Sequence, residues 1–103
     1  MNGILTKYGC LLVFLLVAGK APALNDLEMI FADCVGRYSA EVEHARILGR
    51  NDEDAVALYR DFDALLTATV TPERAREVYA HRVAAKMAQA SLLTVATFSQ
   101  DRP

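Results

Sequence analysis

The sequence predicts an all-α protein, an up-down-up three-helix bundle that follows an N-terminal signal helix. Three observations lead to this fold class. Apolar residues recur every three or four positions through residues 24–103, and no stretch shows the apolar–polar alternation of a half-buried strand. The breaks near Gly49 and Thr71 are short, and short connections make consecutive helices antiparallel. We expect the helices at about 26–48, 52–68 and 72–98.

Residues 1–23 have the three parts of an export signal. A short polar stretch carries one cation, Lys7, and is followed by an apolar run over 11–18 and a small-x-small site that ends at Ala23. The run is far shorter than the roughly 20 apolar residues that cross a bilayer. We expect cleavage after Ala23, which leaves 24–103 as one 80-residue helical domain.

An uncleaved N-terminal anchor is the alternative, because Lys20 is unusual so close to a cleavage site. The protein would then touch the membrane only through this segment. Both interpretations predict an exported protein, periplasmic or secreted. The excess of eight Arg over three Lys is typical of a GC-rich bacterial genome.

The charge balance argues against a nucleic-acid partner. The whole chain has a formal charge of −2, and loss of Lys7 and Lys20 would leave nine basic and thirteen acidic residues, a formal charge of −4. Proteins that bind phosphate backbones present a concentrated basic face, which this composition does not provide.

Cysteine usage predicts a single thiol in the cleaved protein. Cys10 lies inside the signal, so only Cys34 remains after cleavage. Cys34 falls between Phe31 and Tyr38 in an apolar stripe, and we expect a buried, inert core residue. Pairing between chains and a reactive thiol are the alternatives in an oxidising compartment.

The first predicted helix, 26–48, is capped by Asn25 or Asp26 and ends before Gly49. Its apolar residues step by three and four onto one face, which we expect to meet the core. This face comprises Leu27, Ile30, Phe31, Cys34, Val35, Tyr38, Val42, Ala45 and Leu48. A back strip of Met29, Ala32, Gly36, Ala40 and Ile47 is small and weakly polar, and we expect a homodimer or helical partner to cover it.

The second helix, 52–68, begins at an acidic cluster, where the helix dipole favours negative charge. The cluster lacks the Gly and the distal Glu of a calcium loop. The third helix, 72–98, begins with Thr71 as N-cap and Pro72 at the first position. The expected core face of the second helix comprises Ala55, Leu58, Tyr59, Phe62, Leu65, Leu66 and Thr69.

Two charged residues interrupt the apolar faces, Glu41 on the first helix and Arg82 on the third. With a rise of about 1.5 Å per residue through the three helices, Glu41 and Arg82 should lie at similar positions along the bundle axis. We therefore expect either a buried ion pair between Glu41 and Arg82 or two rim residues that extend to water.

His44, His81 and Cys34 are the candidate ligands of a metal ion or a small molecule, because imidazole and thiolate groups suit transition metals. The same estimate places His44 and His81 at comparable positions along the bundle axis. Cys34 and His44 are ten residues apart on one helix, roughly 15 Å along its axis, so one ion cannot bind both. We expect two surface histidines and no cofactor, with a periplasmic metal-binding or ligand-binding protein as the alternative.

Catalysis is not expected. No serine follows the Gly-flanked turn between strand and helix that exposes a nucleophile, and no histidine is obviously brought beside Cys34. The acidic residues look like solvated helix charges, many of them three or four positions from a basic residue.

The second half of the third helix gives the strongest indication of function. From Ala84 to Phe98 the only charge is Lys86, and apolar or small residues occur on every side. A helix that is apolar all round is normally buried all round, which two neighbouring helices can scarcely achieve. We expect non-enzymatic helix–helix association with a second copy or a helical partner. An alanine-rich surface helix without a partner is the alternative, because Ala is a strong helix former. The predicted interaction surface comprises Met87, Ser91, Val95 and Phe98.

Overall fold

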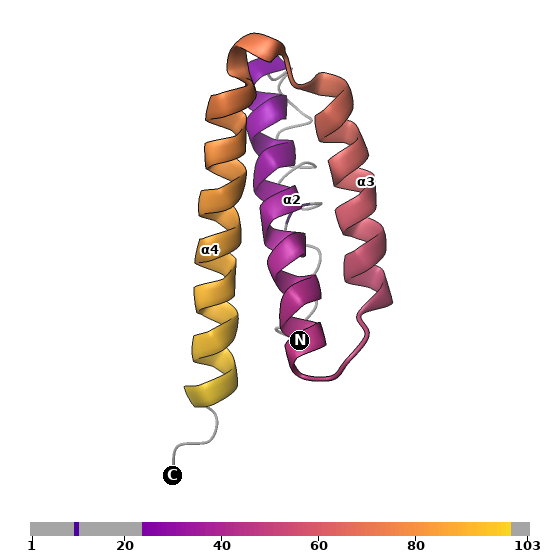
Figure 1. Cartoon of the computed structure of the whole chain (residues 1–103), viewed down its shortest axis with the longest axis vertical. Helices are drawn as coiled ribbons and strands as arrows, with labels where there is room; N and C mark the ends of the chain where they lie inside the picture. The colour runs from indigo at the N-terminus through magenta and orange to yellow at the C-terminus, as the bar shows by residue number, and fades with distance from the viewer. Residues whose placement is uncertain (1–9, 11–23, 100–103) are drawn as a thin grey trace.

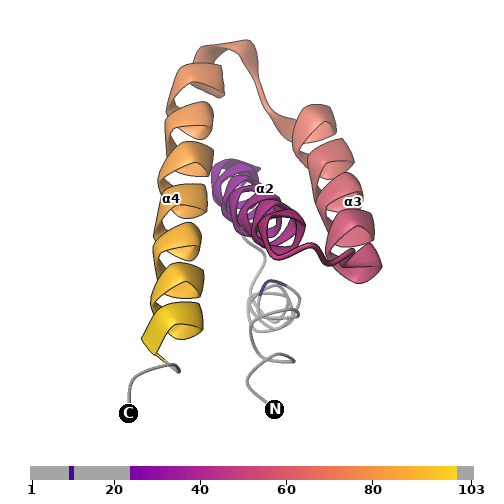
Figure 2. The ribbon, with the colours of Figure 1, turned by 60° about the horizontal axis from the view of Figure 1, so that its bottom comes forward.

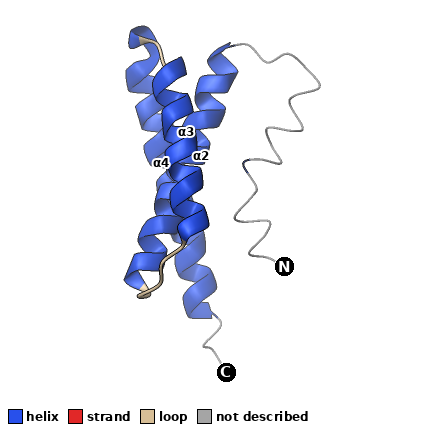
Figure 3. Ribbon diagram, turned by 90° about the vertical axis from the view of Figure 1, so that its right-hand side faces the viewer, coloured by secondary structure: helices blue, strands red, loops and turns tan. Residues whose placement is uncertain are grey.

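The computed structural model describes Cys10 and residues 24–99, and the helical prediction is confirmed there. Three long helices and one short 3₁₀ helix account for nearly all of these residues, and this part of the chain contains no strand (Figure 3). None of the described helices is long and apolar enough to cross a bilayer. The predicted signal, apart from Cys10, lies outside the described residues. The elements are α2 (Leu24–Ile47), α3 (Glu53–Thr69), η1 (Pro72–Arg74) and α4 (Ala75–Ser99).

Helix α2 lies between α3 and α4 and packs against both (Figures 1 and 2). Successive helices run in opposite directions, with α2 and α4 pointing down and α3 pointing up in Figure 1, so α2 and α4 are parallel. Contact between α3 and α4 is sparse by comparison, and Arg82 provides one bridge between them. Helix α4 therefore has essentially one helical neighbour within the described part of the chain.

Helix α2 ends before Gly49, as the sequence predicts. Gly49 has a φ of 71°, a left-handed conformation that glycine adopts without steric cost. The Arg50 N–H donates to Ala45 O at 2.8 Å, and the Gly49 N–H donates to Arg46 O at 3.0 Å, which is the Schellman pattern. Asp52 is the N-cap of α3, and its side chain accepts from the Ala55 N–H at 3.1 Å.

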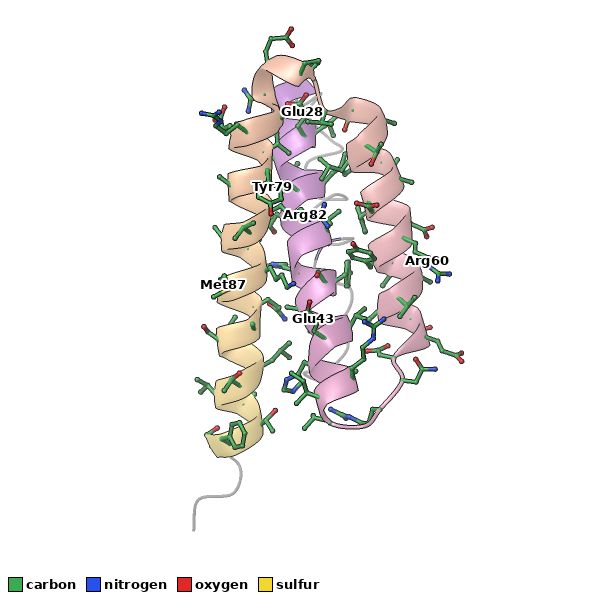
Figure 4. All side chains as sticks on the ribbon, viewed as in Figure 1. Glu28, Glu43, Arg60, Tyr79, Arg82 and Met87 are labelled. Atoms are coloured by element: carbon green, nitrogen blue, oxygen red, sulfur yellow. A yellow bond between two sulfur atoms is a disulfide. The ribbon has the colours of Figure 1, made fainter. Side chains whose placement is uncertain are left out.

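The α3–α4 connection differs from the prediction in its first turn. Residues 72–74 form a 3₁₀ turn, and the Thr71 side chain makes no capping hydrogen bond. The Thr71 N–H instead donates to Glu28 Oε1 of α2 at 3.1 Å. Glu28 thus ties this connection to the start of α2, a contact between residues far apart in the sequence (Figure 4).

Glu28 is a buried carboxylate, only 2% exposed. Burying an unpaired charge is costly, and Arg74 offsets that cost by placing its Nε 3.0 Å from Glu28 Oε2. The angle of this contact is poor for a hydrogen bond, so the two side chains interact mainly as opposite charges. The two oxygens of the Glu28 carboxylate therefore both contact the α3–α4 connection, one at Thr71 and the other at Arg74.

The core lies mainly between α2 and α3. The ring of Phe62 on α3 lies between two rings of α2, with centroids 6.2 Å from Phe31 and 5.9 Å from Tyr38. Cys34 and Val35 are buried beside them, as expected. Two expected core residues, Leu48 and Leu65, are instead more than two-fifths exposed.

The α2–α4 interface depends on Gly36. A Cβ at this position would overlap the Arg82 carbonyl oxygen and lie 2.9 Å from the Lys86 backbone nitrogen. The backbones of the two helices therefore meet where α2 has no side chain. Ala32 and Ala40, one turn to either side, are also buried. The middle of the back strip, expected to be covered by a partner, is instead covered by α4 of the same chain.

Gly36→Ala is expected to destabilise the fold by about 1–3 kcal/mol, because the added methyl group meets backbone that cannot turn aside. In a helix without this neighbour the same change would stabilise by roughly 0.5–1 kcal/mol. The sign of the change in the free energy of unfolding, measured in urea, therefore tests the contact. A more stable variant would contradict it.

Phe62→Ala is expected to cost about 3–5 kcal/mol, since it empties the space between two α2 rings. Leu65→Ala is the matched control on the same helix, because Leu65 is 44% exposed where Phe62 is 5% exposed. Thermal melts of the two variants should differ clearly. Equal melting temperatures would show that α3 does not present Phe62 to the core.

Candidate functional site

The exposed apolar side of α4 is the candidate site. The residues predicted from the sequence lie there: Met87, Val95 and Phe98 are 63, 64 and 66% exposed, and Ser91 is exposed with them. Met87 points away from α2 in Figure 4. The α4 outer face, as we use the term, consists of Ala80, Ala84, Met87, Ala88, Ser91, Val95 and Phe98.

Polar contacts along the opposite side of α4 fix this orientation. Gln89 is buried and donates to Glu41 Oε1 of α2 at 2.9 Å. Near the end of the helix, Thr97 Oγ1 and His44 Nε2 are hydrogen-bonded at 2.9 Å. Val78 is buried at the other end. These contacts hold one side of α4 on α2 over most of its length, so the outer face is turned to solvent.

Charged side chains near the outer face are directed to other helices. Lys86 Nζ lies 2.6 Å from Glu43 Oε1 of α2. Arg82 reaches α3, where it donates to Tyr59 Oη at 3.2 Å and lies 3.5 Å from Asp63 Oδ1. The outer face therefore carries no charged side chain, and Ser91 is its one polar member.

Large exposed hydrophobic side chains are concentrated on α4. Among the described residues there are nine, and six of them belong to this helix, so the exposure is a property of α4 rather than of the surface as a whole. Single exposed apolar residues are common, but a cluster of this kind is typical of an interaction site. The six are Tyr79, Val83, Met87, Leu92, Val95 and Phe98.

The structure gives Glu41 and Arg82 different partners, which corrects the expected ion pair between them. Glu41 accepts from Gln89, whereas Arg82 pairs with Asp63. The reason is the register of the parallel helices, because Arg82 lies at the level of Gly36 and Gln89 at the level of Glu41. A seven-residue difference on a helix is roughly 10 Å.

The same register separates the two histidines. His44 bonds to Thr97 near one end of α4, and His81 Nε2 lies 3.9 Å from Asp33 Oδ1 near the other. The expected similarity in their heights is therefore wrong. No group of three or more His, Cys, Asp or Glu side chains suited to a metal ion occurs among the described residues.

Cys34 is buried, as predicted, but it is bonded to Cys10. The expectation of a single thiol assumed that Cys10 leaves with the signal. In the intact chain both cysteines belong to the hydrophobic core cluster, and the disulfide joins the start of the chain to α2. The predicted cleavage site at Ala23 lies between the two cysteines and outside the described residues.

A pocket of about 190 Å³ lies beside this disulfide. His81 contributes to its lining, so the structure does bring a histidine near Cys34, on α4 rather than on the helix of Cys34 itself. Sequence reasoning missed this because the register of α4 was unknown. The described lining residues are Cys10, Met29, Ile30, Asp33, Cys34 and His81.

The disulfide makes a prediction about export that mass spectrometry can check. If the chain is cut after Ala23 once the bond has formed, the unreduced protein should retain residues 1–23, and reduction should release them. Detection of residues 24–103 alone before reduction would contradict the bond in the exported protein.

In a Cys10→Ser control, the buried Cys34 thiol should react with iodoacetamide slowly until denaturant is added.

Comparison with known proteins gives no further assignment. Neither a protein-family model nor a curated protein matches the chain, and no solved structure does so. The α4 outer face and the pocket beside the disulfide are the two features of the described residues that point to a function.

Proposed function

We propose that this chain is a small exported protein that acts without catalysis, by helix–helix association through the α4 outer face. One observation carries the proposal, namely the exposure of Met87, Val95 and Phe98 on one side of a single helix. Hydrophobic side chains of this size gain stability when they leave water, each by about 1.5–3 kcal/mol on full burial. A helical partner is the occupant that best fits a long, straight apolar face.

The way α4 is held supports this proposal. Gln89, Lys86 and Thr97 fix its inner side to α2, so the outer face is presented on a rigid element. A preformed face loses little conformational entropy on binding, which favours association. Export is the part of the proposal that rests on the sequence of residues 1–23.

Binding of a small ligand beside the disulfide is the second candidate function. The pocket is lined by Cys34 and His81, two of the three residues that the sequence singled out for ligand binding. Its volume of about 190 Å³ is below the 300–1,000 Å³ typical of ligand sites. Helix association is therefore the stronger candidate.

Val95→Glu tests the association directly. A carboxylate at the contact must be desolvated or must exclude the partner, so binding should weaken about tenfold or more. In the unassociated protein Val95 is exposed, so the same substitution should change the free energy of unfolding by no more than about 0.5 kcal/mol. Analytical ultracentrifugation or partner binding measures the first effect, and circular dichroism measures the second.

Leu65→Glu is the matched control, because Leu65 is an exposed apolar residue on α3, away from the outer face. It should leave association unchanged. An unfolded Val95→Glu protein would place Val95 in the core instead. Unchanged binding in a folded Val95→Glu protein would remove the main support for the proposal.

A further inference from the structure

Side-chain sizes along the α4 outer face are distributed unevenly. The end near the start of the helix carries Ala80 and Ala84, whereas the far end carries Val95 and Phe98. In the middle, the large Met87 lies one turn from the small Ser91. A partner that fits this face must therefore be bulky at one end and small at the other, in the opposite order.

A second copy of the same helix meets this requirement when it runs antiparallel. We infer that the partner in the proposed function is a second copy of this chain, related by a two-fold axis at the level of residue 89. This pairing sets each large residue against a small one: Phe98 against Ala80, Val95 against Ala84, and Met87 against Ser91. A parallel pairing would instead set Phe98 against Phe98 and leave alanines facing alanines across a gap.

Angular positions on the helix agree with this pairing. At 100° per residue, Ala80 and Phe98 coincide around the α4 axis, Ala84 and Val95 differ by about 20°, and Met87 and Ser91 differ by about 40°. The two members of each pair therefore lie on the same side of the two-fold axis, as symmetry requires. The paired stretch from Ala80 to Phe98 is roughly 27 Å long.

The charge distribution also suits a symmetric contact. A charged residue close to a two-fold axis faces its own copy, which is repulsive. Lys86 is the nearest charged residue along the chain to the proposed axis, and its ammonium group is directed to Glu43 of α2, 2.6 Å away. No like charges therefore meet at the centre of this contact.

The size of the contact sets the expected affinity. Stable interfaces bury about 800 Å² on each partner, and one face of a single helix lies at the lower end of the range. We therefore expect a weak, reversible dimer with a dissociation constant on the order of 1–100 μM. Sedimentation of the full chain from about 1 μM to about 1 mM covers this range.

A charge pair tests the antiparallel register. Val95→Glu alone should raise the dimer dissociation constant about tenfold or more. The double variant Ala84→Lys/Val95→Glu should recover most of that loss, because each new Glu then meets a new Lys of the other copy. In a parallel dimer the same double variant sets Glu against Glu and Lys against Lys, so it should be as weak as the single variant or weaker. That outcome would overturn the register.

Cysteine cross-linking tests the same register with small substitutions. Ala80→Cys and Phe98→Cys proteins, mixed under mild oxidation, should give a heterodimer, whereas each protein alone should remain mainly uncross-linked. Cross-linking of Ala80→Cys with itself would overturn the antiparallel arrangement. Peptide mapping confirms that the native Cys10–Cys34 bond is retained.

Different results would exclude the second copy as partner and the α4 outer face as interaction surface. A wild-type chain that remains monomeric at 1 mM would overturn the second copy as partner. If such a monomer still bound a purified helical partner and Val95→Glu abolished that binding, the α4 outer face would keep its proposed function. If Val95→Glu changed neither self-association nor partner binding, both would be overturned.

Discussion

The close contact between α2 and α4 at Gly36 is the constraint on which the rest of the structure depends. With no side chain at this point, the backbone of α4 can rest on that of α2. This contact fixes the register of the two parallel helices, which in turn sets Gln89 opposite Glu41 and Thr97 opposite His44. Once these partners are fixed, the side of α4 that faces solvent is fixed as well.

The central position of α2 explains why the outer face exists. In a closed three-helix bundle each helix has two neighbours, but here α4 packs mainly on α2 (Figure 2). The aromatic core is built between α2 and α3, around Phe62. Where the backbones of α2 and α4 meet, α2 carries Gly36 with the buried Ala32 and Ala40 one turn to either side. The large apolar residues of α4 are consequently left outside the core.

The sequence predicted the local features well because each depends on a few neighbouring residues. Helix spacing, the acidic start of α3 and the glycine turn at Gly49 are of this kind. The exposed residues of α4 could also be identified, since uncharged helical stretches are visible in the chain. Register could not be predicted, because it depends on backbone contact at Gly36 and on the long-range Glu28–Thr71 bond. The expected Glu41–Arg82 pair and the relative heights of the histidines failed for this reason.

The Cys10–Cys34 bond also makes the stability of this small fold depend on its surroundings. A cross-link that spans 24 residues stabilises a folded chain by about 3 kcal/mol, mainly by restricting the unfolded chain. Domains of ordinary stability have only about 5–15 kcal/mol in total. In a reducing cytosol the newly made chain would therefore be substantially less stable. The same intact chain would be more stable in an oxidising environment than in a reducing one, by roughly the amount that the cross-link contributes.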